Sequence, residues 1–161
     1  MRGLAAIALG SHLTSGIGDR EANLRAAIER VRALGEVRAV SSFYDTTPVG
    51  YVKQPRFLNG ALLLETEMEP VELLQGLLEV ERAMGRVRSV LKGAVLKGPR
   101  VIDLDLLLVG GLVMETEELT LPHPEMHRRR FVLEPLAEIA PEMVHPVLGL
   151  TVGELLGRLT A

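Results

Sequence analysis

Short apolar runs along the chain, some of them alternating with polar residues, predict β-strands. Runs of this length that are bounded by glycine, proline or polar residues are typical of strands in a sheet. We expect strands over residues 4–9, 37–44, 57–65 and 101–109. The Gly110-Gly111 pair that follows the last run predicts a two-residue hairpin turn into a short strand near residues 112–114.

Other apolar positions recur every three or four residues, which is the spacing of one helix face. This spacing predicts helices over residues 20–34, 70–84, 128–139 and 151–159. Asp19 is a suitable N-cap for the first helix, and Gly35 ends it. Pro70 suits the first turn of the second helix, whereas Pro135 should bend or interrupt the third. One side of the second helix carries Leu73, Leu74, Leu77, Leu78 and Glu81.

The remaining segments and the order of the elements predict the fold class. Residues 46–56 contain two prolines and should form an ordered, irregular loop, while residues 85–98 contain three glycines and should form a long mobile loop. The order β-α-β-β-α-β, with further helices near the C-terminus, predicts an α+β fold. We expect a ferredoxin-like sandwich, with helices packed on a mainly antiparallel sheet, in a single domain over residues 1–161.

Composition and charge exclude several classes of protein. A chain of 161 residues with 47% hydrophobic and 24% charged residues is typical of one soluble globular domain. The absence of cysteine excludes disulfides, thiolate metal sites and cysteine nucleophiles. There is no apolar run that could span a bilayer and no secretory signal pattern, so we expect a cytoplasmic protein without a membrane partner. A formal net charge of −3 argues against a nucleic-acid partner.

Two carboxylates stand two residues apart in the apolar run 101–109. In a strand, Asp103 and Asp105 would share one face while Leu104 pointed to the other. Adjacent like charges are unfavourable unless a cation lies between them, and oxygen ligands with few protein donors suit Mg²⁺ and substrate phosphates. A solvated strand face is the alternative interpretation. Nearby guanidinium groups that could bind a polyphosphate favour the magnesium site; they belong to Arg86, Arg88 and Arg100.

Several short motifs follow one another in a specific order between residues 4 and 145. They are Gly10-Ser11, Ser41-Ser42-Phe43-Tyr44, Phe57-Leu58-Asn59, Gly85-Arg86-Val87-Arg88, Gly98-Pro99-Arg100, Asp103-Leu104-Asp105, Leu121-Pro122-His123, Arg129, Phe131 and Pro135-Leu136-x-Glu138. Together they resemble the 6-hydroxymethyl-7,8-dihydropterin pyrophosphokinases of folate biosynthesis. The resemblance implies transfer of pyrophosphate from ATP to the hydroxymethyl group of a reduced pterin, with release of AMP. It also implies two Mg²⁺ ions, ATP as co-substrate and a monomer that has only small-molecule partners.

The resemblance also assigns roles to individual residues. It makes Asp103 and Asp105 the metal ligands and, with Arg86, Arg88 and Arg100, the catalytic set. The positions that it implies for ATP binding are Glu81, Arg86, Arg88, Arg100, His123 and Arg129. Those that it implies for pterin binding are Thr46, Thr47, Val49, Phe57, Asn59 and Phe131. Aromatic faces and an amide suit a flat heterocycle that both donates and accepts hydrogen bonds.

Simpler roles and other functions stay open at this point. A helix glutamate such as Glu81 is more often a surface residue, and a histidine after proline, such as His123, more often stabilises a turn. A different Mg²⁺-dependent phosphate or nucleotidyl enzyme would use the same aspartates without a pterin pocket. A non-catalytic ferredoxin-like module that binds a small molecule would use neither the aspartates nor ATP turnover.

Overall fold

The structure is a computed structural model, and it describes residues 3–11, 20–46, 57–86 and 101–159. Its main sheet has the strand order β2-β4-β1-β5, and β3 pairs with β4 beside β2. Every pairing in this sheet is antiparallel, as the sequence predicts. The strands are β1 (Gly3–Ser11), β2 (Glu36–Val40), β3 (Tyr44–Thr46), β4 (Phe57–Thr66) and β5 (Asp103–Val109).

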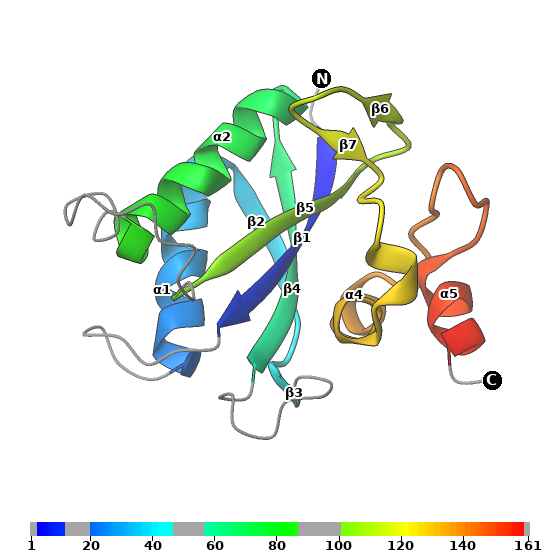
Figure 1. The fold of residues 1–161 in the computed structure, drawn as a ribbon, viewed down its shortest axis with the longest axis horizontal. Helices are drawn as coiled ribbons and strands as arrows, with labels where there is room; N and C mark the ends of the chain where they lie inside the picture. The colour runs from blue at the N-terminus through cyan, green and yellow to red at the C-terminus, as the bar shows by residue number, and fades with distance from the viewer. Residues whose placement is uncertain (1–2, 12–19, 47–56, 87–100, 160–161) are drawn as a thin grey trace.

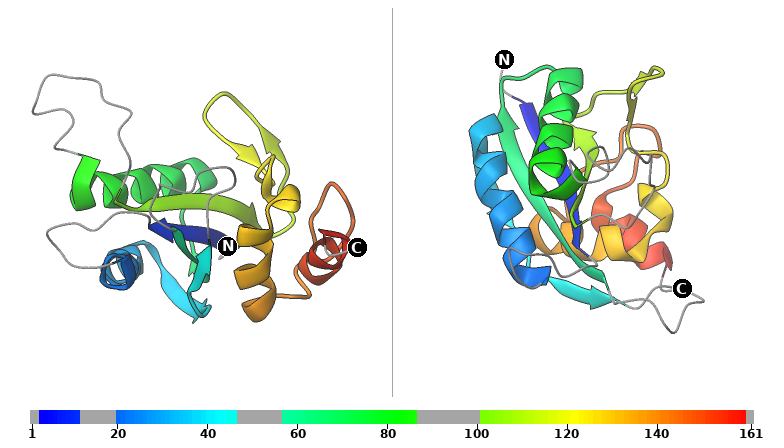
Figure 2. Two further views of the ribbon diagram at one scale, coloured as in Figure 1. Left: turned by 60° about the horizontal axis from the view of Figure 1, so that its bottom comes forward. Right: turned by 60° about the vertical axis from the view of Figure 1, so that its left-hand side comes forward.

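Helices cover both faces of this sheet (Figures 1 and 2). They are α1 (Arg20–Val31) and α2 (Pro70–Glu81) on one face, and α4 (Arg130–Ile139) and α5 (Val152–Leu159) on the other. Side chains alternate along β1, so Ile7 and Leu9 pack in the core under α1 and α2, while Ala6 and Ala8 pack in the core with α4. The small alanines allow α4 to approach the strands closely. The predicted layered α+β sandwich is therefore confirmed.

The predicted helices agree with the structure at most of their ends. A short 3₁₀ turn, η1 (Arg32–Leu34), continues α1 to Gly35, and a π-helical turn, η2 (Arg82–Arg86), continues α2. Pro70 occupies the first turn of α2, and a capping box between Glu69 and Glu72 satisfies backbone groups at that end. The first two helix predictions are therefore confirmed.

The sequence predicts that Pro135 bends or interrupts the third helix, and the interruption is wrong. Helix α4 runs through it without a break, and Pro135 itself is buried. The proline removes one backbone hydrogen bond, because it has no N–H to donate to the carbonyl four residues earlier. Burial of Val132, Leu133 and Leu136 in the core with β1 and β4 offsets that loss.

The predicted strand over residues 37–44 is divided into β2 and β3. Between them, the backbone N–H of Ser41 donates to the carbonyl of Ala61, and its hydroxyl oxygen accepts from the N–H of Ala61, both at 2.9 Å. A side-chain oxygen thus replaces a backbone partner at this position, and the regular ladder stops there.

The hairpin predicted after β5 is wrong in its pairing. Gly110 does form a turn, for which its φ of 53° suits glycine. The strand that follows, β6 (Met114–Glu115), pairs with β7 (Thr120–Leu121) and not with β5. A 3₁₀ turn, η3 (Met126–Arg128), leads from there into α4. Within the described segments, no helix is long and apolar enough to cross a membrane.

Candidate functional site

The two aspartates lie on the first half of β5, which is the strand at one end of the main sheet. Asp103 is partly buried and Asp105 is exposed, while Leu104 between them is buried in the core with α1 and α2. The prediction that both carboxylates share a face is confirmed. This face is the α4 side of the sheet, because Asp105 pairs with Ala8, which packs in the core with α4.

A single row of residues across the sheet joins the candidate metal ligand to a candidate pterin residue. Gly10 on β1 pairs with Asp103 on one side and with Asn59 on the other, and Asn59 in turn pairs with Tyr44. Residues opposite one another in antiparallel strands point to the same face. Asn59 and Asp103 therefore share one face of the sheet, with only Gly10 between them.

The Asn59 side chain lies directly beside Gly10. A Cβ at Gly10 would stand 3.4 Å from the Oδ1 atom of Asn59, in van der Waals contact. Asn59 is 6% exposed, as expected of an amide that has partners inside the fold. The Gly10-Ser11 motif and the Phe57-Leu58-Asn59 motif, far apart in the sequence, therefore meet at this row.

Glu81 is not the surface residue that helix statistics favour. It is 3% exposed, and its Oε2 atom accepts a hydrogen bond of 2.8 Å from the backbone N–H of Leu104. That N–H belongs to the residue between Asp103 and Asp105, on a strand with no further neighbour in the described sheet. Glu81 thus fixes the backbone that carries both aspartates.

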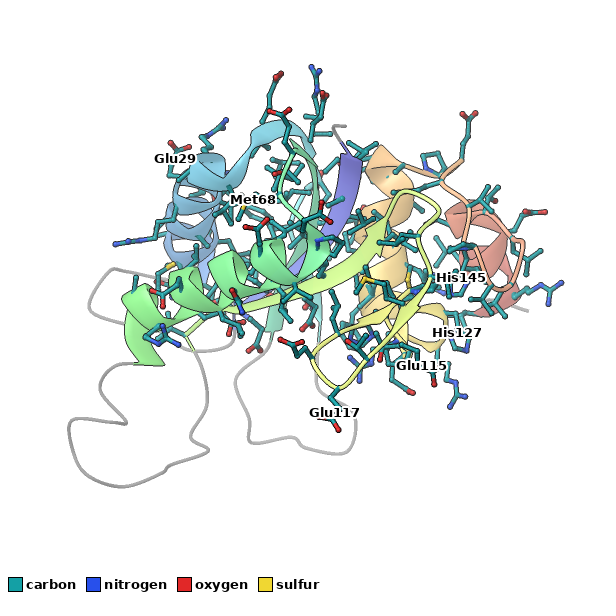
Figure 3. All side chains as sticks on the ribbon, turned by 90° about the horizontal axis from the view of Figure 1, so that it is seen from above. Glu29, Met68, Glu115, Glu117, His127 and His145 are labelled. Atoms are coloured by element: carbon teal, nitrogen blue, oxygen red, sulfur yellow. The ribbon has the colours of Figure 1, made fainter. Side chains whose placement is uncertain are left out.

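A pocket of about 320 Å³ opens beside β5 and is lined by Glu81, Asp105 and His123. Its apolar wall is formed by Leu74 and Leu78 on α2, which are partly buried, whereas Leu73 and Leu77 of the same helix lie in the core. The β6–β7 hairpin closes another side, and Figure 3 shows Glu117 at its tip. In the sequence, each core leucine of α2 is followed directly by a second leucine. The apolar face of the helix is therefore wider than burial in the core requires, and this extra width is the sequence signal for the pocket wall.

His123 is partly buried between β5 and the turn that leads to η3. Its backbone N–H donates to the carbonyl of Leu107 at 2.9 Å, and its Nδ1 accepts from the N–H of Glu125 at 3.1 Å. Burial lowers the pKa of His123, and Arg129 adds to this, while the Asp105 carboxylate opposes it. The neutral ring therefore carries its proton on Nε2. The turn role and a role as a donor beside Asp105 are both compatible with this geometry.

Two further candidate residues are in contact at the start of α4. The Arg129 guanidinium carbon lies 5.7 Å from the centroid of the Phe131 ring, within range of a cation–π interaction. Phe131 is 43% exposed, so its ring is accessible to a ligand. Arg129, which the resemblance assigns to ATP binding, thus lies beside Phe131, which it assigns to pterin binding.

Several predicted site residues fall outside the part of the chain that the structure describes. This applies to Arg88, Arg100, Thr47 and Val49, and to the side chains of Thr46, Phe57 and Arg86. Among the described residues, no group of three or more His, Asp or Glu side chains is arranged to hold a metal ion. A cation at Asp103 and Asp105 would need water or substrate oxygens to complete its coordination.

Comparison with known proteins gives a consistent result. Residues 6–141 match the family model described as 7,8-dihydro-6-hydroxymethylpterin-pyrophosphokinase. The 2-amino-4-hydroxy-6-hydroxymethyldihydropteridine pyrophosphokinase of Bacillus subtilis is 46% identical over 145 residues, which cover 89% of this chain and 81% of that protein. Folic acid synthesis protein fol1 of Schizosaccharomyces pombe is 40% identical over 147 residues, or 90% of this chain, but the match covers only 19% of the yeast protein.

Solved structures agree in fold. The crystal structure of wild-type Plasmodium falciparum HPPK-DHPS superposes with a TM-score of 0.74 at 16% identity, over 98% of this chain and 45% of that one. At this identity the likeness supports the fold alone. The sequence matches carry the assignment, and on them the chain belongs to the 7,8-dihydro-6-hydroxymethylpterin-pyrophosphokinase family.

Proposed function

We propose that the protein transfers pyrophosphate from ATP to the hydroxymethyl group of 6-hydroxymethyl-7,8-dihydropterin. The hydroxymethyl oxygen forms a bond to the β-phosphorus, the bond between that phosphorus and the α,β-bridging oxygen breaks, and AMP leaves while the hydroxyl proton is released. The observation that carries the proposal is the row in which Asn59 and Asp103 flank Gly10 on one face. It juxtaposes a residue suited to a heterocycle with one suited to a metal–phosphate complex.

We propose Asp103 and Asp105 as the ligands of Mg²⁺, with two ions bound in the complete complex. The donor set fits: two carboxylates share one face, and Asp105 is exposed to solvent, so waters and phosphate oxygens have access to it. When bound, the cations neutralise polyphosphate charge at the reacting phosphorus. The Glu81–Leu104 hydrogen bond holds the strand that presents these carboxylates.

The nucleotide side of the site is proposed to include Glu81, His123 and Arg129. His123 supplies an Nε2–H donor at neutral pH, and Arg129 a guanidinium group. Glu81 acts through the β5 backbone, whereas Arg86, Arg88 and Arg100 remain proposed phosphate-binding residues. Because phosphoryl transfer depends mainly on positioning and charge, these donors need no covalent role.

The pterin side is proposed to include Asn59 and Phe131. Asn59 supplies both a donor and an acceptor, and the exposed Phe131 ring supplies an apolar face. Thr46, Thr47, Val49 and Phe57 complete the proposed set. We further propose one domain over residues 1–161 that acts as a cytoplasmic monomer on small molecules, with no nucleic-acid or membrane partner.

The test is to measure nucleotide products from ATP and Mg²⁺ with and without 6-hydroxymethyl-7,8-dihydropterin. AMP that forms only with the pterin, in the absence of ADP, would support the proposal. ADP, or AMP formed without the pterin, would indicate a different phosphate or nucleotidyl enzyme. Pterin binding with no turnover of ATP would indicate a binding module. The family match favours neither alternative.

A further inference from the structure

Glu138 joins two sequence motifs that the proposed reaction does not use. It stands near the end of α4 in the Pro135-Leu136-x-Glu138 motif, and its partners lie in the Ser41-Ser42-Phe43-Tyr44 motif, more than 90 residues away. The backbone N–H of Ser42 donates to Oε2 at 2.9 Å, the Ser42 hydroxyl to the same oxygen at 3.0 Å, and the Tyr44 hydroxyl to Oε1 at 2.7 Å.

The backbone N–H of Ser42 can only donate and both hydroxyls can donate, so the three partners together favour an ionised carboxylate. The Tyr44 hydroxyl and the Ser42 backbone lower the pKa of Glu138, and the same carboxylate raises the pKa of Tyr44 to about 12. Glu138 is therefore charged and Tyr44 protonated throughout the neutral range. Hydrogen bonds to an ionised acceptor are stronger than those between neutral groups.

The contact fixes a strand that has few other supports. Tyr44 begins β3, which has three residues and pairs only with β4 within the described sheet. On the other side, Asp45 forms an ion pair of 3.3 Å with Arg20 of α1. β3 is thus held between α1 and α4 by side chains, and the Glu138 contact supplies its attachment to α4.

The same strand borders the proposed pterin side of the site. Tyr44 is the register partner of Asn59, so the row across the sheet runs from Tyr44 through Asn59 and Gly10 to Asp103. Helix α4 carries Glu138 near one end and Phe131 at the other. The position of β3 relative to α4 therefore determines where Tyr44, the register partner of Asn59, lies relative to Phe131.

We propose that Glu138 is a positioning residue for the pterin: its carboxylate holds Ser42 and Tyr44 against α4 and thereby aligns β3 with Asn59. This inference rests on the proposed function and adds a residue that does not touch either substrate. If the Glu138 contact served only stability, its loss would partly unfold the protein and would raise the apparent KM values for the pterin and for ATP by the same factor. If Glu138 positions the pterin side of the site, its loss raises the Kd and KM for the pterin and leaves the KM for ATP nearly unchanged.

The decisive variant is Glu138→Gln, which keeps the side-chain length but places an amide NH₂ group where a donor now points. We expect the Kd and KM for the pterin to rise about fivefold, since Glu138 is exposed and solvent screening reduces the contribution of a hydrogen bond to its charge. The KM for ATP should change less than twofold. Glu134→Gln is the matched control, one turn earlier on α4, where Glu134 pairs with Arg130 at 3.4 Å on the surface; it should leave both constants unchanged.

Tyr44→Phe provides a second variant that retains the ring and removes only the hydroxyl. Combined with Glu138→Gln, it should show strongly non-additive effects on the pterin Kd, because both changes remove the same contact. Equal changes in the pterin and ATP constants, or a pterin Kd that none of these variants alters, would overturn the role of Glu138. Failure of the unaltered protein to bind the pterin would instead contradict the proposed function itself.

Discussion

The carboxylate of Glu81 accepts a 2.8 Å hydrogen bond from the backbone N–H of Leu104, and this bond connects α2 to the strand that carries both aspartates. Leu104 is buried with its side chain in the core, while its neighbours Asp103 and Asp105 face the opposite side. A buried N–H without an acceptor is costly, so Glu81 is required by the strand itself. Its position on the wall of the pocket follows from that requirement.

Replacing Glu81 with alanine should destabilise the fold by about 1–3 kcal/mol, because the Leu104 N–H loses its acceptor inside the protein. Glu81→Gln, which retains one carbonyl oxygen, should cost less. Urea denaturation monitored by circular dichroism measures both effects. Glu79→Gln is the control, because Glu79 lies on the exposed side of α2, where it pairs with Arg82, and it should change stability by less than about 0.5 kcal/mol. Equal losses for Glu81→Ala and Glu79→Gln would contradict this account.

Asp105→Asn should abolish most of the pterin-dependent AMP release while leaving the fold intact. The side chain is exposed, so its replacement removes no core contact. We expect a fall in kcat of more than about 100-fold, since even groups that only support a metal ligand are worth roughly 10- to 100-fold. The measurement pairs AMP release with a thermal unfolding curve. Glu115→Gln on β6, an exposed carboxylate that does not line the pocket, should keep full activity. Near-normal turnover in Asp105→Asn would remove the metal-site proposal.

Acid should destabilise the protein through His145. Its side chain is buried, and its Nδ1 accepts from the backbone N–H of Leu148 at 3.1 Å. The centroid of its ring lies 6.1 Å from that of His127. Figure 3 labels both residues. Burial, with His127 adding to it, lowers the pKa of His145 below 6.5. The unfolded chain therefore binds more protons in this range, and the free energy of unfolding decreases as the pH falls below about 6.5.

His145→Asn tests this prediction, because asparagine retains an acceptor for the Leu148 N–H but does not titrate. The loss of stability between pH 7 and pH 5, measured by thermal unfolding, should be smaller in this variant than in the unaltered protein. Burial also lowers the pKa of His123, so His123 also makes the free energy of unfolding decrease as the pH falls. It therefore accounts for any pH dependence of stability that remains in His145→Asn. Identical pH dependence in both proteins would exclude His145 as a source.

Gly35→Ala should destabilise the protein by about 1–3 kcal/mol, the usual cost of forcing an extra methyl group into a packed region. A Cβ at Gly35 would overlap the carbonyl oxygen of Glu65 on β4 and stand 3.0 Å from the Cβ of Thr66. Gly157→Ala on α5 is the control, since no atom lies within 4 Å of the new methyl group. There the change should stabilise the helix by about 0.5–1 kcal/mol. A denaturation series on the two variants checks both signs.

Predictions from local patterns were confirmed where one periodicity dominated a segment. The alternation around Leu104 placed Asp103 and Asp105 on one face, and the three-to-four spacing of leucines predicted α2. Predictions were wrong where a strand had a different partner from the one that the local pattern implied. The Ser41 hydroxyl takes the place of a backbone group opposite Ala61 and divides a predicted strand, and β6 pairs with β7 although Gly110-Gly111 is a good hairpin turn.

Local sequence patterns were sufficient to predict most of the elements, the antiparallel α+β class and the shared face of the aspartates. Each depends on the spacing of residues close along the chain, where backbone geometry sets the periods of 2 and 3.6. No local pattern indicates that Asn59 and Asp103 flank Gly10, that Glu81 binds the edge of β5, or that Glu138 holds Tyr44; the folded structure shows all three. These relationships depend on strand register and on packing between elements, and the alternation along one strand carries no information about which distant residue lies beside it.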